Sequence, residues 1–320
     1  TRMFGHRSRL VIAGIALVAI IAGGLSLFGT QIRTHIFARA MPQDFFGHFR
    51  TIEPQLYQVS GAVYAYEAGY ARSLILRTED GIGVFDTFSV KHAVEMKDAI
   101  EHEFPGEAVK WVVHSHHHFD HIRGSGTFEG AEVIGHKDIN ERILDFSNAS
   151  ESVARTTRSL SGDQTIVLGD VEVEALYMPN SHSDTLYAFR IPSEDVVFAP
   201  DMMFVDHVPP FGFPDFYHPG YIRALDRLIA LNATHYVPTH GWRGDRDDLI
   251  AYRDMEVDMY EFIEAELMAR IDRAEEDATI AEILKVAYPE LREKYGHLHG
   301  FDAMFVAKFG RKLGGAFLGY

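Results

Sequence analysis

The chain has 320 residues, of which 47% are hydrophobic and 12% aromatic, and its formal net charge is -16 at pH 7. That length fits one large domain with an appendage, and the acidic balance argues against a nucleic-acid substrate, because proteins that bind a phosphate backbone usually present a basic patch. The sequence contains no cysteine, which excludes disulfide bonds, thiolate metal ligands and a thiolate nucleophile.

The first predicted element is a transmembrane helix over residues 10–28. This run, LVIAGIALVAIIAGGLSLF, has 19 residues without a charge, close to the roughly 20 apolar residues that cross a bilayer as a helix. A cleaved signal peptide is the alternative, but its apolar region usually has about 7–15 residues. Three arginines precede the run and two follow it within residues 29–40. The positive-inside rule then favours a single-pass protein with an extracytoplasmic catalytic domain, anchored through residues 1–40.

Residues 41–245 are predicted to form the catalytic domain, rich in strands. Strand-like runs at 56–69 and 73–87 include a hairpin turn at Glu79-Asp80-Gly81. Apolar residues at helical spacing predict a helix over 90–103. The other expected elements, in chain order, are a strand at 109–114, a helix at 137–148, two strands within 164–178, strands at 185–191 and 195–200, a helix at 219–231 and a strand at 234–238.

Residues 246–320 are charged and predicted to be helical, so we expect a C-terminal helical extension. A Thr-x-x-Glu pattern at Thr279 and Glu282 predicts a capping box that begins its second helix. This extension is expected to cover the catalytic domain or to make an oligomer contact.

A dense group of histidines follows the strand at 109–114. The stretch 111–124 reads WVVHSHHHFDHIRG and places His116, His118, Asp120 and His121 in the pattern His-x-His-x-Asp-His. Clustered imidazolium ions repel one another, whereas zinc and similar divalent metals bind clustered neutral imidazoles. The alternative is a histidine-rich surface loop. Further candidate ligands elsewhere in the chain would argue against that alternative.

Three further candidate ligands also follow strand-like runs, where a rigid sheet positions functional loops. They are His182 in MPNSHSDT, Asp201 in VVFAPDMMF and His240 in HYVPTHGW. Each alone has a structural explanation, as a turn residue, a helix cap or a core imidazole. Their ordered recurrence at strand ends indicates a metal site.

These motifs resemble the metallo-β-lactamase-fold superfamily of metallohydrolases, over about residues 52–245 and including Asp86 in VFDT. The resemblance implies an α+β fold, a four-layer αββα sandwich. It also implies that His116, His118 and His182 hold one metal, that Asp120, His121 and His240 hold another, and that Asp201 bridges both. Asp86 would lie beneath the site and orient a ligand. Arg123 departs from the family, which often has glycine there, so the conformation of this loop stays open.

Two divalent metals about 3.5–4 Å apart can share a nucleophilic hydroxide. We expect two ions, zinc first and Mn²⁺ or Fe²⁺ as alternatives, with Asp120 as a catalytic residue that orients the hydroxide. The ligand set resembles that of glyoxalase II-type thioesterases and lactonases, so an ester, lactone or thioester carbonyl is the expected target. A β-lactamase, a phospho- or sulfo-ester hydrolase, and an accessory subunit docked on a membrane protein complex are the alternatives.

The substrate is expected to be a small molecule of apolar or acyl character. Aromatic and methionine residues crowd the segment between Asp201 and His240, where they would line the mouth of the site or else pack beneath the C-terminal helices. Tyr217 or His218 is a candidate donor to a substrate oxygen. We interpret His114 as strand packing and His117 as solvent-facing or as support for a ligand; His207, His297 and His299 have no assigned role. A homo-oligomer is a further partner hypothesis.

Overall fold

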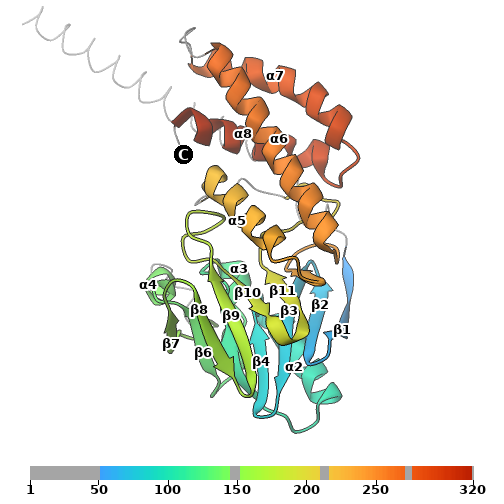
Figure 1. Cartoon of the computed structure of the whole chain (residues 1–320), viewed down its shortest axis with the longest axis vertical. Helices are drawn as coiled ribbons and strands as arrows, with labels where there is room; N and C mark the ends of the chain where they lie inside the picture. The colour runs from blue at the N-terminus through green and yellow to red at the C-terminus, as the bar shows by residue number, and fades with distance from the viewer. Residues whose placement is uncertain (1–50, 145–151, 210–215, 271–275, 319–320) are drawn as a thin grey trace, which may run out of the picture. The chain divides into compact units, whose positions relative to one another are not determined.

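The fold is built on two β-sheets, shown with their helices in Figure 1. The computed structural model describes residues 51–144, 152–209, 216–270 and 276–318, all within the compact unit Phe49–Tyr320. The predicted transmembrane segment 10–28 lies outside these ranges. Within them, no helix has both the length and the apolar character that crossing a membrane requires.

The first sheet has seven strands in sequence order. Its members are β1 (Ile52–Ser60), β2 (Val63–Gly69), β3 (Ala71–Thr78), β4 (Gly81–Phe85), β5 (Val109–Val113), β6 (Glu132–His136) and β7 (Arg158–Leu160). Strands β1 to β4 pair antiparallel, whereas β4 to β7 pair parallel. The turn at residues 79–80 joins β3 to β4, which confirms the predicted hairpin.

The second sheet has five strands in the order β12-β11-β10-β9-β8. They are β8 (Gln164–Leu168), β9 (Val171–Tyr177), β10 (Tyr187–Ile191), β11 (Val196–Ala199) and β12 (His235–Pro238). Only β11 and β12 pair parallel; the other neighbours are antiparallel. The predicted strands in this part of the chain are therefore confirmed within one to two residues.

A buried apolar core fills the space between the two sheets. It includes Leu74 and Phe85 from the first sheet and Phe189 and Phe198 from the second, all fully buried. Phe85 meets Phe189 and Phe198 edge to face, with ring centroids 5.2 and 6.1 Å apart. Burial of such rings is a main source of fold stability and fixes one sheet against the other.

Helices cover the outer faces of the sheets. Helix α2 (Val90–Glu103) packs its residues Ala93, Met96 and Ile100 on the first sheet, as its apolar spacing predicts. On the second sheet, helix α5 (His218–Ala230) accepts a hydrogen bond from Tyr236 of β12 at the carbonyl of Leu228. The shorter helices are α3 (Phe119–Ile122), α4 (Ile139–Leu144), and the 3-10 turns η1 (Ser125–Thr127) and η2 (Pro192–Glu194). The structure thus has the predicted α+β composition of two packed sheets with helices.

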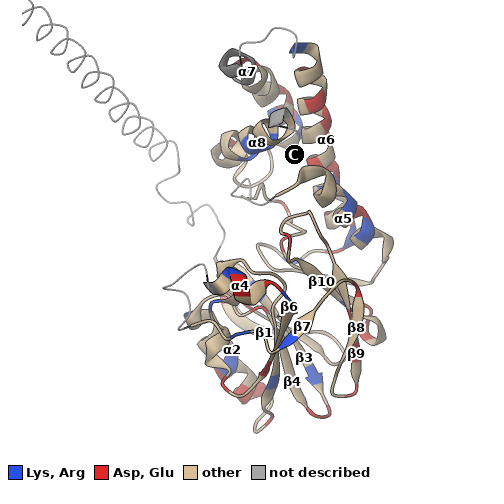
Figure 2. Cartoon of the chain, turned by 90° about the vertical axis from the view of Figure 1, so that its left-hand side faces the viewer, with Lys and Arg blue, Asp and Glu red and all other residues tan. Residues whose placement is uncertain are grey.

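The C-terminal extension consists of α6 (Arg246–Arg270), α7 (Glu276–Tyr295) and α8 (Phe301–Leu318). Acidic residues, red in Figure 2, are frequent along α6. Its apolar face buries Leu249, Met255, Met259 and Ile263. The predicted capping box is wrong, because α7 begins at Glu276 and Thr279 already lies inside the helix.

Candidate metal centre

Strand direction brings the predicted ligands to one end of the sandwich. Strands β4 and β5 run parallel, so Asp86 and the histidine-rich loop leave the first sheet at the same edge. In the second sheet β9 runs in the direction of β11 and β12, because β10 is antiparallel to both of its neighbours. The loops that follow β9, β11 and β12 carry His182, Asp201 and His240, and they therefore meet at one edge as well.

The first group of potential ligands comprises His116, His118, His182 and Asp201, whose donor atoms lie within 4.8 Å of one another. Nε2 of His182 lies 2.9 Å from Asp201 Oδ2 and 2.9 Å from Nδ1 of His118. Nε2 of His116 lies 3.7 Å from the same carboxylate oxygen.

The second group comprises Asp120, His121 and His240. Asp120 Oδ2 lies 3.8 Å from Nε2 of both histidines. Asp201 also contacts this group, because its Oδ2 lies 3.2 Å from His121 Nε2 and its Oδ1 lies 3.2 Å from His240 Nε2. The structure thus brings all seven predicted ligands together in the arrangement that the resemblance implies, with Asp201 between the groups.

The hydrogen bonds behind the rings indicate that lone pairs face inward. His121 Nδ1 lies 2.8 Å from Asp86 Oδ2, and His240 Nδ1 lies 3.2 Å from the carbonyl oxygen of Tyr70. A neutral ring held in this way carries its proton on Nδ1, so its Nε2 can bind an ion. The two Nε2 atoms lie only 3.2 Å apart. One cation could contact both nitrogens, so the residues fit a bound metal.

His116 supports the same interpretation. It is fully buried, its Nδ1 contacts Ser115 Oγ at 2.9 Å, and its Nε2 has no hydrogen-bond partner. A buried polar atom without a partner costs about 1–3 kcal/mol, and a metal ion would satisfy it. Imidazole nitrogens with carboxylate oxygens form a donor set suited to Zn²⁺ and also to iron or manganese.

The electrostatics of the centre also favour a cation. Burial and the neighbouring histidines hold the pKa of His116 well below its ordinary value. Burial alone would lower the pKa of His121, but the carboxylates of Asp201, Asp120 and Asp86 raise it well above the ordinary value. Burial acts to raise the pKa of Asp201, yet His121, His182 and His240 lower it strongly. The buried carboxylates are therefore stabilised by a positive charge close to them.

Asp86 and Ser115 support the ligands from behind. Asp86 is fully buried; besides the bond from His121, its carboxylate accepts bonds of 2.8 Å from Ser115 N and 2.7 Å from Ser115 Oγ. Asp86 thus lies behind His121 and bonds to it, as expected for a residue that orients a ligand from beneath the site. Ser115 was not singled out in the sequence, although it lies inside the motif.

The backbone around Asp201 is held in an unusual conformation. Its φ is 54°, which non-glycine residues adopt uncommonly. Thr239 Oγ1 donates to Asp201 Oδ1 at 2.9 Å and accepts from Asp201 N at 3.1 Å, and Tyr221 OH donates to the Asp201 carbonyl at 2.7 Å. These contacts fix the carboxylate between the two groups, and neither Thr239 nor Tyr221 carries a sequence signal for this role.

The described part of the aromatic segment after Asp201 packs against the C-terminal helices, and its role in a substrate mouth stays a prediction. Phe204 stacks 6.2 Å from the ring of His240 and also contacts Tyr252 of α6 at 5.5 Å. Met202, Met203, Phe204, Phe216 and Tyr221 are all buried; Phe211 and Phe213 lie outside the described residues.

His218 contacts the C-terminal extension. It is buried, its Nδ1 lies 2.7 Å from Lys312 Nζ, and its ring stacks on Tyr260 at 4.5 Å. Its Nε2 has no hydrogen-bond partner, and a donor role for His218 or Tyr217 stays a prediction.

The remaining histidines lie outside both ligand groups. His114 is fully buried, in agreement with a packing role, and His117 bonds to Thr185 Oγ1 at 2.9 Å. His207 and His299 contact each other with ring centroids 4.8 Å apart.

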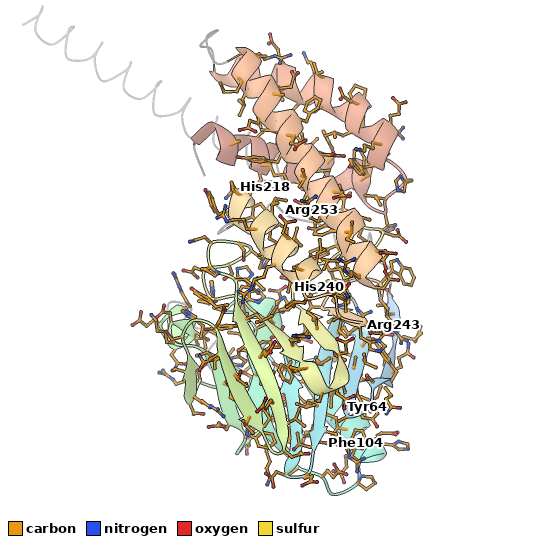
Figure 3. The ribbon with its side chains drawn as sticks, in the orientation of Figure 1. Tyr64, Phe104, His218, His240, Arg243 and Arg253 are labelled. Atoms are coloured by element: carbon orange, nitrogen blue, oxygen red, sulfur yellow. The ribbon has the colours of Figure 1, made fainter. Side chains whose placement is uncertain are left out.

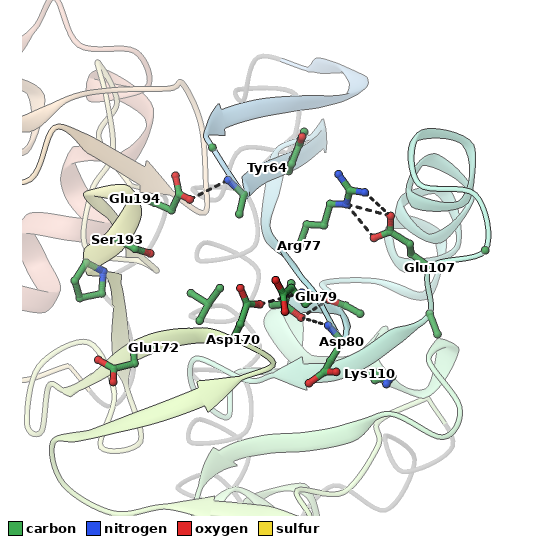
Figure 4. A pocket seen from close by; sticks show the side chains of 18 residues that line it. Tyr64, Arg77, Glu79, Asp80, Glu107, Lys110, Asp170, Glu172, Ser193 and Glu194 are labelled. Atoms are coloured by element: carbon green, nitrogen blue, oxygen red, sulfur yellow. Dashed lines mark hydrogen bonds and ion pairs between the residues drawn. The ribbon is translucent and has the colours of Figure 1, made fainter.

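The cavities among the described residues include two of different size and position. The larger, about 1200 Å³, lies among polar side chains that include Arg77, Asp170 and Glu194 (Figure 4). Tyr64 of this cavity lies at the end of the sandwich opposite to His240 in Figure 3, so the cavity is remote from the candidate metal centre. A cavity of about 570 Å³ is lined mainly by α6 and includes Phe204, whose ring stacks on that of His240, but none of the candidate ligands lines it.

A model of the metallo-beta-lactamase superfamily matches residues 67–240, which is more than half of the chain. The chain belongs to this superfamily. Two curated relatives are the alpha and beta subunits of 2,4-dinitroanisole O-demethylase from Nocardioides sp. (strain JS1661). The alpha subunit is 28% identical to this chain, and the match covers 77% of this chain and 73% of the subunit. The beta subunit is 26% identical, and the match covers 77% of this chain and 76% of the subunit.

Solved structures agree on the metallo-beta-lactamase fold. A metallo-beta-lactamase from Pontibacter korlensis has a TM-score of 0.56 at 18% identity, covering 64% of this chain and 99% of its own. A double mutant of the sec-alkyl sulfatase PisA1 has a TM-score of 0.66 at 16% identity, covering 83% of this chain and 50% of its own. At these identities the likeness concerns the fold alone. The narrower likeness to glyoxalase II-type enzymes and lactonases stays a prediction.

Proposed function

We propose that this superfamily member is a metal-dependent hydrolase that holds two divalent ions and cleaves an ester, lactone or thioester. The single observation that supports this most strongly is the position of Asp201, whose two carboxylate oxygens each lie 3.2 Å from a histidine of the second group while Oδ2 also lies 2.9 Å from His182 of the first. We expect Zn²⁺ to be the bound ion, with Mn²⁺ or Fe²⁺ as alternatives.

The bound ions would lower the pKa of water toward about 7 and act as Lewis acids toward a substrate oxygen. The protein side chains would hold the ions and orient the nucleophile. Asp120 is two-thirds exposed, with a side-chain exposure of 67%, although its Oδ2 lies 3.8 Å from two buried imidazoles. It would therefore hold an ion of the second group through Oδ2 and orient the attacking hydroxide on the side of the centre that is open to solvent.

An activated aryl ether is an alternative substrate class, favoured by the two relatives that are named as subunits of 2,4-dinitroanisole O-demethylase. In such a hydrolysis the water oxygen would bond to the ring carbon, the ring carbon–oxygen bond would break, and methanol would leave. The β-lactamase and phospho- or sulfo-ester alternatives rest on fold likeness alone.

Assembly with a second subunit is a further proposal, because both relatives are named as subunits. The partner would be another chain of the same superfamily or a membrane protein complex. Attachment to a membrane through residues 10–28 stays a prediction, and detergent-dependent extraction of the full chain tests it.

The test of the hydrolase is elemental analysis of the purified protein together with assays on an ester, a lactone, a thioester, a β-lactam, a sulfate ester and a nitro-substituted aryl methyl ether. We expect about two divalent equivalents, and activity on one of these classes that a chelator removes. Asp120→Asn should lower turnover by at least about 100-fold, whereas Asp170→Asn, at the far end of the sandwich, should not. Unchanged turnover in Asp120→Asn would refute the role of Asp120, and a metal-free, stably folded protein would refute the proposal as a whole.

A further inference from the structure

A buried ion pair lies directly behind the loop that carries His240. Arg72, near the start of β3, has an exposed fraction of 1%, and Glu67 of β2 has 2%. Arg72 Nε donates to Glu67 Oε2 at 2.8 Å. Burying two charges costs several kcal/mol per ion unless their hydrogen bonds are satisfied, so the further contacts of this pair bear on its role.

The guanidinium of Arg72 binds carbonyl groups on both sides of His240. Nη1 donates to the carbonyl of Pro238 at 2.8 Å, and Nη2 donates to that of Gly241 at 2.9 Å. Nη1 also lies 3.4 Å from the carbonyl oxygen of Trp242. The backbone N–H of Arg72 donates to the carbonyl of Thr239 at 2.7 Å. The planar fork of an arginine suits such divergent acceptors, whereas a lysine ammonium does not.

Residues 238–242 depend on the hydrogen bonds from Arg72, because regular strand pairing ends at their start. Strand β12 ends at Pro238, and Gly241 has a φ of 72°, where the chain turns. Beyond this point the sheet-like contacts are isolated bridges, from Ala71 to His240 and from Tyr236 to Gly244. Without Arg72, the carbonyls of Pro238 and Gly241 would lose their charged donor inside the protein.

Glu67 keeps a partner even without Arg72. It accepts a bond from Gln55 Nε2 at 2.7 Å, and Arg243 Nη2 pairs with its Oε1 at 2.5 Å. Arg243 and His240 lie at the same end of the sandwich in Figure 3. Replacing Arg72 alone therefore leaves no unpaired buried carboxylate, which makes a folded variant a reasonable expectation.

We propose that Arg72 is a positioning residue for the second metal group: its guanidinium fixes the backbone at residues 238–242 and thereby aims His240 Nε2 at Asp201. The ring of His240 is further held by Tyr70, which stacks on it at 4.8 Å and accepts its Nδ1–H through the backbone carbonyl. The side-chain hydrogen bonds of Arg72 go to Glu67 and to residues 238–242, and none goes to the three histidines of the first group, so we expect the stronger effect at the second group. This inference rests on the proposed metal binding.

The test compares wild type, Arg72→Gln and Arg72→Lys, with Arg77→Gln as the matched control. Arg77 pairs with Glu107 at the remote cavity of Figure 4 and has an exposed side chain. Each protein is titrated with Zn²⁺ against a competing chelator, and hydrogen exchange of residues 236–246 is followed by mass spectrometry on the metal-free protein. Circular dichroism checks that each variant is folded.

We expect Arg72→Gln to keep one tight Zn²⁺ equivalent and to bind the second about 10- to 100-fold more weakly. Hydrogen exchange at residues 236–246 should accelerate in the same variant. Arg72→Lys should restore neither property, and Arg77→Gln should match wild type.

A folded Arg72→Gln protein with wild-type exchange and wild-type affinity for the second ion would overturn the inference, as would equal weakening of both ions. If wild type binds no Zn²⁺ but exchange still accelerates only in the Arg72 variants, the proposed function fails while the positioning of the loop stands. If Arg72→Gln does not fold, Arg72→Lys carries both measurements.

Discussion

Asp86 determines which nitrogen of His121 faces the candidate metal centre. Its carboxylate accepts the Nδ1 proton at 2.8 Å and is itself held by two bonds from Ser115. The ring therefore cannot turn or change tautomer without losing a buried hydrogen bond. This is the kind of contact that raises the basicity of a ligating imidazole.

We predict that Asp86→Asn weakens Zn²⁺ binding by about 10- to 100-fold. An amide has one acceptor oxygen in place of two, so it cannot accept from His121 and from both Ser115 donors equally well. Competition titration with a chromogenic chelator measures the change. Asp170→Asn is the matched control, because its carboxylate accepts a bond from Glu79 N at the remote end of the sandwich. Equal Zn²⁺ affinity in wild type and Asp86→Asn would contradict the role of Asp86.

The candidate ligands could be selected from the sequence because the chemistry of metal binding depends on residue type. The histidines and aspartate at 116–121 are followed by His182, Asp201 and His240, each after a strand. No single structural role, such as packing or capping, explains all of these residues together. Arg72 and Thr239 gave no such signal. Their roles depend on a backbone carbonyl or a neighbouring loop that only the folded chain brings near, and single-residue chemistry does not contain that information.

At the scale of elements, segments with a clear apolar pattern were predictable. Helix α2 and strands β8 and β9 match the expected pattern, since each has alternating or helical spacing over its length. Strands β6 (EVIGH) and β7 (RSL) were missed, because neither has a continuous apolar run such as VVFA in β11. Helix α4 is shorter within the described residues than the predicted 137–148.

Helices α5, α6 and α8 meet at a buried charged cluster that no periodicity could reveal. Glu256 of α6 pairs with Lys308 and Lys312 of α8, and Lys312 contacts His218 of α5. Burial and the lysines lower the pKa of His218 to about 2, and burial lowers that of Lys312 to about 7. The cluster connects the extension to the helix that carries Tyr221, whose hydroxyl binds the Asp201 carbonyl.

His218 predicts a particular loss of stability in acid. Its pKa is about 2 in the folded chain and 6.5 ordinarily, so below pH 6.5 the unfolded chain binds the extra proton. The free energy of unfolding then falls as pH drops, by at most about 1.4 kcal/mol per pH unit from this group. Lys312, with a pKa of about 7 in the folded chain, and Glu256, whose pKa folding lowers from 4.5, add slopes of the same sign near pH 6.5 and pH 5. The contribution of His218 is therefore measured as the difference between wild type and a variant that lacks it.

We expect His218→Gln to remove this contribution, because glutamine can accept from Lys312 without titrating. Urea unfolding at pH 6.5, 5.75 and 5 should show the stability difference between wild type and variant moving in favour of the variant as pH falls. His235→Gln, on the partly exposed end of β12, is the control. A difference that is constant across this range would show that His218 is not kept neutral by its surroundings.

At the scale of the whole molecule, the candidate centre exists only where the two sheets meet. The first sheet supplies the loop with His116 to His121, and the second supplies His182, Asp201 and His240. Metal binding is thus coupled to the packing of one sheet on the other, and the unfolded chain has no such site. A ligand that binds only the folded state stabilises it by RT ln(1 + [L]/Kd), about 2.7 kcal/mol at 100 times Kd for each independent site.

Removal of metal should therefore lower the melting temperature, and added Zn²⁺ should raise it with the logarithm of its free concentration. Thermal unfolding in a series of chelator-buffered Zn²⁺ concentrations measures this slope. His116→Asn removes a ligand of the first group and leaves the second in place, so its slope should fall to roughly half of the wild-type value if two independent ions bind. A melting temperature that does not respond to Zn²⁺ in wild type would mean that the inward-facing lone pairs of His121 and His240 are satisfied in some other way. A response that is identical in wild type and His116→Asn would place the stabilising ion in the second group alone.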